Sequence, residues 1–277
     1  MKIVEDLQEP LISVTLQTDA GCVRDMNEDA GRFFKPNDPI LLERKGILTV
    51  VADGMGGHSG GEVASQLAVE VINRVYYDLD ESPKEALRSA FETANREIYE
   101  ASVADKNLEG MGTTCTALVI CNGLAHVAHV GDSRLYLLRA GEIYQMTEDH
   151  SAVMEMVKLG IISMEQARNH EDKNVIIRAL GTAPQVEVSL WERPIAVRDY
   201  DHFILCSDGL CDLVEDKVIK ELVLSAADDY LACESLIDLA KTRGGHDNIT
   251  VGLVSFKPAG FVGTRDVRET REAEVLL

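Results

Sequence analysis

The pattern of apolar and polar residues along the chain predicts strands and helices in separate groups. Apolar and polar residues alternate over residues 12–18, which is the period of a half-buried strand. Residues 46–52 are almost continuously apolar and predict a second, central strand. Over residues 63–75 apolar positions recur at steps of three and four, and a capping box at Ser82 followed by proline predicts the start of another helix.

The next stretch returns to strands joined by tight turns. Asn122-Gly123 lies between two apolar runs and predicts a hairpin, and Ala140-Gly141 predicts another. Residues 151–185 combine short amphipathic pieces with a polar stretch, which predicts a surface flap. The remaining pattern predicts strands at 186–191 and 202–207, helices near 216–226 and 230–242, and a last strand at 248–256.

This grouping of elements favours a layered α+β domain over a doubly wound parallel sheet. Two antiparallel sheets with helices outside them fit the order of strands, turns and helices. After Phe256 the composition shifts to a run of mixed charges. We therefore expect an N-terminal extension at residues 1–11, one domain at 12–257, and a charged C-terminal tail at 258–277.

Composition narrows the class of function. The 277 residues contain 27 Lys and Arg against 47 Asp and Glu, a formal net charge of −20, so nucleic acid is not an expected partner. The longest apolar run is far below the roughly 20 residues that cross a bilayer, and the N-terminus lacks the features of a signal peptide. The six cysteines show no metal spacing and predict buried thiols. We expect a cytoplasmic monomer without membrane contact.

Acidic residues recur in polar or glycine-rich loops at the ends of apolar strands. A carboxylate at the end of a buried strand costs several kcal/mol at least unless it is compensated, and a divalent metal is the simplest compensator. Carboxylates and carbonyls without paired His or Cys suit Mg²⁺ or Mn²⁺ and not zinc. The alternative is that each Asp only caps a turn or a helix. The acids are Glu28, Asp29, Asp53, Asp132, Asp208 and Asp247.

Other phosphate and metal motifs fail on inspection. The loop that starts at Asp25 begins like an EF-hand, but Ala30 replaces its turn glycine. The pair Asp78 and Asp80 resembles an aspartyl-phosphate motif, yet it falls at the end of a predicted helix. The sequence contains neither a P-loop nor a cysteine phosphatase motif. Arg24 shares a loop with several acids, so it can either bind a phosphate or pair with a neighbouring carboxylate, and both interpretations stay open.

An ordered set of motifs resembles a known family. The segments GCVRDMNED, VADGMGGHSGGEVAS, MGTTCTALVI, AHVGDSRLYLLR, TEDHS, IIRALG, ILCSDGLCD and GGHDNITV span about residues 13–256. They are similar to those of the metal-dependent protein Ser/Thr phosphatases (PPM, the type 2C phosphatases) in their bacterial form. The resemblance implies a four-layer αββα sandwich, two antiparallel β-sheets flanked by helices, with a metal centre at one end.

The resemblance also implies a role for each matched residue around two Mn²⁺ or Mg²⁺ ions. Asp53 would bridge the two metals, Asp208 and Asp247 would complete the first, and the Gly54 carbonyl would complete the second. The remaining implied roles are Glu28 and Asp29 as outer-shell water holders, Arg24 as the phosphate clamp, and Asp132 as the carboxylate that joins Asp208 around a weaker third metal.

Two further positions bear on the mechanism that the resemblance implies. Asn248 would orient Asp247 or the site water. Met55 follows Gly54, where many eukaryotic members carry a histidine that is the proposed general acid. The general acid is therefore unassigned, and His58 or a metal-bound water would serve.

The function that the resemblance implies is hydrolysis of phosphoserine and phosphothreonine in proteins by a water that bridges two divalent metals. The partners would be phosphorylated proteins, the substrates of Ser/Thr kinases. The alternative is a catalytically weak or dedicated partner-switching regulator of the same fold.

Overall fold

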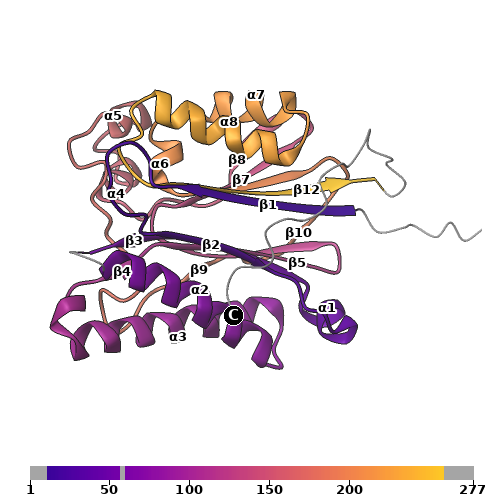
Figure 1. The fold of residues 1–277 in the computed structure, drawn as a ribbon, viewed down its shortest axis with the longest axis horizontal. Coiled ribbons are helices and arrows are strands. Elements are labelled where there is room, and N and C mark those ends of the chain that lie inside the picture. Colours follow the sequence, from indigo (N-terminus) through magenta and orange to yellow (C-terminus); the bar gives the residue numbers. More distant parts are fainter. Residues whose placement is uncertain (1–10, 57–59, 259–277) are drawn as a thin grey trace, which may run out of the picture.

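Two antiparallel sheets pack face to face between two layers of helices (Figure 1). The computed structural model describes residues 11–56 and 60–258. The first sheet has the order β1 (Leu11–Asp19), β12 (Ile249–Lys257), β11 (His202–Cys206), β7 (Arg134–Arg139) and β8 (Glu142–Gln145). The second has the order β10 (Ile195–Ala196), β6 (Leu124–Val130), β5 (Cys115–Cys121), β3 (Ile47–Met55) and β2 (Asp29–Phe34). Short β4 (Gly112–Thr113) pairs with β3, and β9 (Ser189–Leu190) pairs with β6.

Each sheet is covered on its outer face by a pair of long helices, which confirms the four-layer αββα prediction (Figure 1). The helices α2 (Gly60–Asp78) and α3 (Pro83–Ala104) cover the second sheet, and α7 (Asp216–Ser225) and α8 (Asp229–Thr242) cover the first. Ser82 caps α3 as predicted, because its side chain accepts a hydrogen bond from the Glu85 amide. The shorter helices are α1 (Pro39–Lys45), the 3₁₀ turn η1 (Lys106–Leu108), α4 (Ala152–Lys158), α5 (Met164–Arg168) and α6 (Asp208–Cys211).

The apolar core lies in three layers, one between the sheets and one under each helix pair. Strands β5 and β12 are buried on both faces, so apolar side chains dominate them and a strict alternation is lost. Edge strand β1 is only half-buried, and for that reason it keeps the alternation seen in the sequence. The core also takes up Cys115, Cys121, Cys206 and Cys233, which confirms buried thiols at these four positions.

The two predicted hairpins are present. Asn122 and Gly123, with φ of 49° and 70°, join β5 to β6, and Ala140 and Gly141, with φ of 53° and 80°, join β7 to β8. Positive φ at both central residues matches the right-handed twist of the flanking strands. The predicted flap carries α4 and α5, and Ser163 begins α5 with a capping box.

Several elements differ from the predictions. β3 runs on through Asp53 to Met55, and β2 begins at Asp29 inside the predicted polar loop, because Asp29 pairs with Asp53 across the two strands. α6 begins at Asp208 where only a loop was expected. The predicted strand 186–191 is reduced to β9. Most of the predicted N-terminal extension and C-terminal tail lies outside the described residues.

We predict that Gly46 is a sensitive glycine of this fold. It ends α1 with φ of 71°, and an added Cβ would overlap the Ile120 carbonyl oxygen. Gly141 has φ of 80° but open space around it. Gly141→Ala should therefore cost about 1 kcal/mol of unfolding free energy, the left-handed penalty alone, and Gly46→Ala more than about 3 kcal/mol. Urea denaturation measures both, and equal losses would show that the carbonyl contact is unimportant.

Candidate metal centre

The register of the two sheets brings the predicted site residues to one end of the sandwich. In the first sheet Cys206 pairs with both Val251 and Arg134, so the segments that carry Asp208, Asp247 and Asp132 leave the sheet at the same end. In the second sheet Asp29 pairs with Asp53. Figure 1 places this end at its left, beside α4, α5 and α6.

The backbone of Asp53 is held by hydroxyl groups from the strand beside it. The Asp53 amide donates to Thr114 Oγ1 at 3.1 Å, and the Asp53 carbonyl accepts from Thr113 Oγ1 at 2.8 Å and from the Thr114 amide at 2.9 Å. Thr114 Oγ1 also lies 2.6 Å from Ser133 Oγ, beside Asp132. Both backbone groups of Asp53 are therefore satisfied, and its carboxylate is left to face the other acids.

Asp29 is bound by two hydroxyls of the facing sheet. Its Oδ2 accepts hydrogen bonds of 2.7 Å from both Ser207 and Thr250, while Oδ1 is buried without a partner. Ser207 immediately precedes Asp208, so this contact joins the two sheets at the centre. The sequence pattern predicted no role for these hydroxyls. Their signal was present, because Ser207 and Thr250 are polar residues in otherwise apolar strand sequences.

Asn248 organises the loop that carries Arg24 and Glu28. Its side-chain amide donates to the carbonyls of Ala20 and Met26, and its Oδ1 accepts from the Glu28 amide at 2.8 Å. Its backbone amide donates to Asp247 Oδ1 at 2.9 Å. Asn248 therefore contacts Asp247 through its main chain, and its side chain fixes the neighbouring loop.

Gly54 allows three segments to meet at the centre. An added Cβ at this position would overlap the carbonyl oxygen of Gly61 in α2 and would crowd that of Glu28. The Gly54 amide donates to the Glu28 carbonyl at 3.2 Å. The side chain of Glu28 lies against Gly61 at the start of α2, and its Oε1 is buried without a partner. Glycine at position 54 is thus required by packing.

Arg24 pairs with a proposed metal ligand. Its Nη2 lies 2.8 Å from Asp247 Oδ2, and the Arg24 side chain is half exposed. This hydrogen bond, together with the charges of Asp247, Glu28 and Asp53, raises the pKa of Arg24. The guanidinium therefore lies at the mouth of the acidic centre, where it offers its remaining donors to solvent. The pairing agrees with the salt-bridge interpretation and leaves phosphate binding compatible with the geometry.

The carboxylates of the centre interact strongly with one another. Burial, followed by the charges of Asp29 and Asp208, raises the pKa of Asp53 well above its usual range. Burial, followed by the charge of Asp132, raises the pKa of Asp208 in the same way. Burial raises the pKa of Asp29 to about 6 and that of Asp132 to about 7. Such a cluster holds protons near neutral pH unless cations replace them.

The donor set fits hard divalent cations. Among the described residues, Glu28 Oε1, Asp29 Oδ1, Asp132 Oδ1 and Asp208 Oδ1 are buried carboxylate oxygens without a hydrogen-bond partner. Oxygen donors of this kind suit Mg²⁺ or Mn²⁺. Within residues 11–56 and 60–258, no three acidic, His or Cys side chains yet converge at ligating distance. To bind a metal, Asp247 would have to release Arg24, so the binding of a cation at this site would require rotation of acidic side chains.

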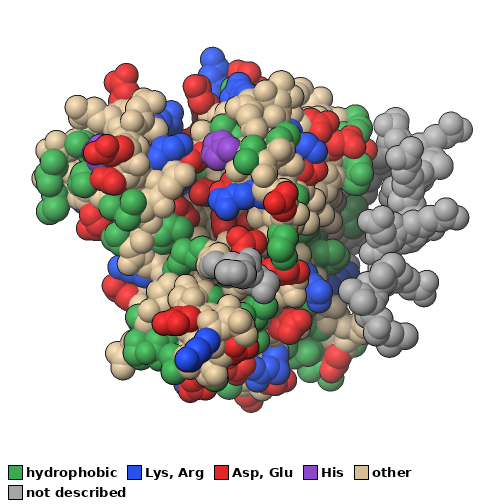
Figure 2. All heavy atoms as spheres, turned by 60° about the vertical axis from the view of Figure 1, so that its left-hand side comes forward, with side chains coloured by type: hydrophobic (Ala, Val, Ile, Leu, Met, Phe, Trp, Pro, Cys, Tyr) green, Lys and Arg blue, Asp and Glu red, His purple; other side chains and the backbone are tan. Residues whose placement is uncertain are grey.

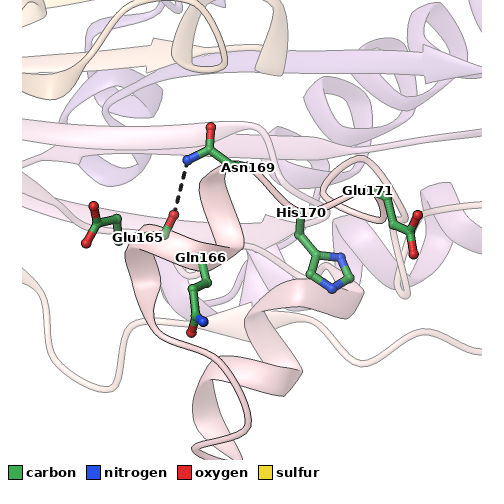
Figure 3. A pocket seen from close by; sticks show the side chains of 5 residues that line it. All are labelled: Glu165, Gln166, Asn169, His170 and Glu171. Atoms are coloured by element: carbon green, nitrogen blue, oxygen red, sulfur yellow. Dashed lines mark hydrogen bonds between the residues drawn. The ribbon is translucent and has the colours of Figure 1, made fainter.

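The flap is tied to the centre by an ion pair and by backbone bonds. Lys173 Nζ lies 2.7 Å from Asp212 Oδ2 beyond α6, and Leu180 exchanges two backbone hydrogen bonds with Thr113. Further out, the polar side chains of Glu165, Gln166, Asn169, His170 and Glu171 line an open hollow (Figure 3). Figure 2, which brings this end of the sandwich forward, shows acidic and basic side chains interspersed on the surface. His58 lies outside the described residues.

The class of this protein follows from comparison with known proteins. A model of the protein phosphatase 2C family matches residues 27–231, and the chain belongs to this family. The serine/threonine phosphatase stp of Listeria monocytogenes is 39% identical over 245 residues, which cover 86% of this chain and 93% of the relative. The predicted family and activity are confirmed. The chain is a metal-dependent protein serine/threonine phosphatase.

Solved structures of serine/threonine phosphatases are similar to this fold. The Mycobacterium tuberculosis serine/threonine phosphatase PstP/Ppp has a TM-score of 0.77 at 36% identity, covering 89% of this chain and 99% of that one. The catalytic domain of PstP in complex with two manganese ions has a TM-score of 0.74 at 33% identity, covering 90% and 99% of the two chains.

In the described part of this chain no helix is long and apolar enough to span a membrane.

We predict that the metal-free protein becomes less stable as the pH rises from about 6.5 to 8.5. A carboxyl whose pKa is raised on folding contributes stability that is complete below its unfolded value of about 3.9 and is lost as the pH rises through the folded value. Asp132, whose pKa burial raises to about 7, should lose about 1 kcal/mol over this range, and Asp53 and Asp208 should add to the loss.

Two buried histidines act in the opposite direction in the lower half of this pH range. Burial lowers the pKa of His129 and His150 to about 3, so the stability that their neutral rings contribute keeps rising until about one pH unit above the unfolded value of about 6.5, and it offsets part of the loss there. Thermal unfolding after chelation tests the prediction, and Asp132→Asn should flatten the pH dependence. Added Mn²⁺ should raise Tm more at pH 8.5 than at 6.5. A metal-free Tm that rises over this window would contradict it.

Proposed function

We propose that this phosphatase acts through Asp53, Asp208 and Asp247 as the carboxylate ligands of two Mn²⁺ or Mg²⁺ ions. The observation that carries the proposal is the gathering of carboxylates at one end of the sandwich. Burial and the charges of neighbouring acids, Asp247 among them, raise the pKa of Asp53 and Asp208, and Asp208 Oδ1 is buried without a partner. The Gly54 carbonyl would complete the second ion, Glu28 and Asp29 would hold its waters, and Asp132 would serve a weaker third ion. Two divalent ions lower the pKa of a bound water and make it a nucleophile near neutral pH.

The protein groups have separate tasks in the proposed hydrolysis of the phosphomonoester. The backbone of Asp53 is fixed by Thr113 and Thr114, so its carboxylate would hold metal ions from a well-ordered strand end. Arg24, at the mouth, would bind two phosphate oxygens and hold phosphorus in line for attack. No side chain of the chain is proposed as the nucleophile, so the hydrolysis would need no covalent phosphoenzyme.

The physiological setting belongs to the same proposal. Phosphorylated proteins, the products of Ser/Thr kinases, would be the substrates of a cytoplasmic, monomeric enzyme in signalling. Neither nucleic acid nor a membrane is a proposed partner, since the net charge of −20 disfavours both phosphate backbones and anionic lipid surfaces. The complete acidic set and the phosphatase relatives do not favour the alternative of a catalytically weak or dedicated partner-switching regulator.

We predict that activity requires added Mn²⁺ or Mg²⁺ and depends on Asp53. Chelation with EDTA should abolish hydrolysis of a phosphothreonine peptide, and Asp53→Asn should lower kcat by at least about three orders of magnitude with the fold retained. Asp80→Asn is the matched control, because Asp80 is an exposed acid that pairs with Arg44 away from the centre. Near-normal turnover of Asp53→Asn would show that the bridging assignment is wrong.

We predict that Arg24→Ala mainly raises KM. Loss of a charge-assisted pair of hydrogen bonds to phosphate corresponds to roughly 2 to 4 kcal/mol. Arg24→Lys keeps the charge without the planar fork and should recover only part of the loss. Steady-state kinetics and thermal unfolding separate the two roles of Arg24. An unchanged KM with a lower Tm would leave only the ion pair with Asp247.

We predict that the outer part of the flap selects protein substrates. Asn169, His170 and Glu171 line the hollow in Figure 3 and lie in the polar stretch at residues 168–174. Replacing all three by alanine should change kcat/KM on phosphoproteins at least about fivefold, roughly 1 kcal/mol. Hydrolysis of para-nitrophenyl phosphate should stay nearly intact, because the small ester reaches the centre without touching the flap. Equal loss on both substrates would show instead that the segment supports the metal centre.

A further inference from the structure

The position of Asp132 depends on the glycine before it. Gly131 has φ of +111°, and an added Cβ would overlap the side chain of Thr114. The turn is therefore pressed against the residue that also holds the Asp53 amide. Asp132 itself is buried, and its Oδ1 has no partner. Since its own side chain is not anchored through that oxygen, the backbone of the turn must set where the carboxylate points.

His150 binds both backbone groups of Gly131. The Gly131 amide donates to His150 Nδ1 at 3.0 Å, and the His150 amide donates to the Gly131 carbonyl at 2.7 Å. A backbone amide is only a donor, so Nδ1 must be the unprotonated nitrogen of the ring. The proton then lies on Nε2, which donates to Ser189 Oγ at 3.0 Å. Arg178 Nη1 lies 3.3 Å from Nε2. Because both nitrogens carry protons in this tautomer, this is a contact and not a hydrogen bond.

The ring is kept neutral by its surroundings. His150 is 5% exposed, and burial, followed by the charges of His129 and Arg178, lowers its pKa to about 3. The His129 ring lies against it, with centroids 4.9 Å apart. His129 Nδ1 lies 2.8 Å from Thr116 Oγ1, and Thr116 Oγ1 donates to the Ser133 carbonyl at 3.0 Å. The turn that carries Asp132 is thus held on both sides.

We propose that His150 is the positioning residue of Asp132: its Nδ1 holds the Gly131 amide and thereby fixes the carboxylate that serves the third metal. The inference rests on the proposed function, which assigns Asp132 to that metal. His150 is also the last residue before the flap, and its carbonyl accepts from the Ile177 amide at 2.9 Å. One residue therefore joins the base of the flap, through its backbone carbonyl, to the turn of Asp132, through its side chain.

The test compares variants that differ in the acceptor at Nδ1. His150→Phe removes it, His150→Gln places its amide farther along the side chain, and His150→Asn keeps an oxygen near the position of Nδ1. His126→Phe on the same strand as His129 is the control, because His126 is half-buried outside these contacts. The amide exchange rate of Gly131 in the metal-free protein is the first readout. We expect exchange to accelerate in His150→Phe and His150→Gln, and to be slow in His150→Asn and in the control.

Metal binding is the second readout. Calorimetric titration with Mg²⁺ should show the weakest site loosened by about 10- to 100-fold in His150→Phe, with recovery in His150→Asn. Asp132→Ala should lose the same site, and His150→Phe should cause no further change in the Asp132→Ala background. A further loss in that background, or unchanged Gly131 exchange in His150→Phe, would overturn the inference. If His150→Phe does not fold, the comparison of His150→Gln with His150→Asn carries the same decision.

The two hypotheses fail in different ways. If the wild-type protein does not hydrolyse phosphopeptides with Mn²⁺, the proposed function fails and the assignment of Asp132 with it, whatever Gly131 exchange shows. If the wild type is active and Asp132→Ala loses the weakest site, but His150→Phe binds Mg²⁺ like the wild type, only the inference about His150 fails.

Discussion

Mutual repulsion among buried carboxylates is the constraint around which this molecule is built. Burial raises the pKa of Asp29, Asp53, Asp132 and Asp208 at one end of the sandwich, and the charges of neighbouring carboxylates raise it further. Unpaired charges in such surroundings cost several kcal/mol each. Native stability is itself only about 5 to 15 kcal/mol. The cluster can therefore persist only in a scaffold whose packing is strong elsewhere and whose centre takes up protons or cations.

Hydrogen bonds from residues at the strand ends of both sheets hold these acidic residues in place. The hydroxyls of Ser207 and Thr250 in the first sheet bind Asp29 of the second, and Thr113 and Thr114 bind the main chain of Asp53. Each of these donors is buried and cannot rotate freely into solvent. Because a register shift of one residue would turn every side chain of a strand to the opposite face, the apolar layers fix the acids as firmly as they fix the core.

The sequence predicted the layers but missed the elements with a polar or short pattern. Hairpins at Asn122 and Ala140 follow from turn chemistry, which is local. β2 was missed because its sequence, DAGRFF, has no strand alternation, and it forms only through pairing with β3. The acidic residues were predicted because each lies in a loop at the end of an apolar run. The hydroxyl groups that bind them were not predicted, since the sequence of a strand does not show whether its Ser or Thr faces an aspartate.

The geometry of the flap shows why such supports bear on function. Its base is held by Leu180 on Thr113, by Lys173 on Asp212, and by His150 on Gly131. Each of these partners is close to a proposed ligand. Thr113 donates a hydrogen bond to the Asp53 carbonyl, Asp212 follows Asp208 by four residues, and Gly131 directly precedes Asp132. A protein substrate that displaces the flap must act against these contacts. The flap and the loops that hold the acids are therefore joined by direct contacts, although 20 or more residues of chain separate the ends of the flap from most of the proposed ligands.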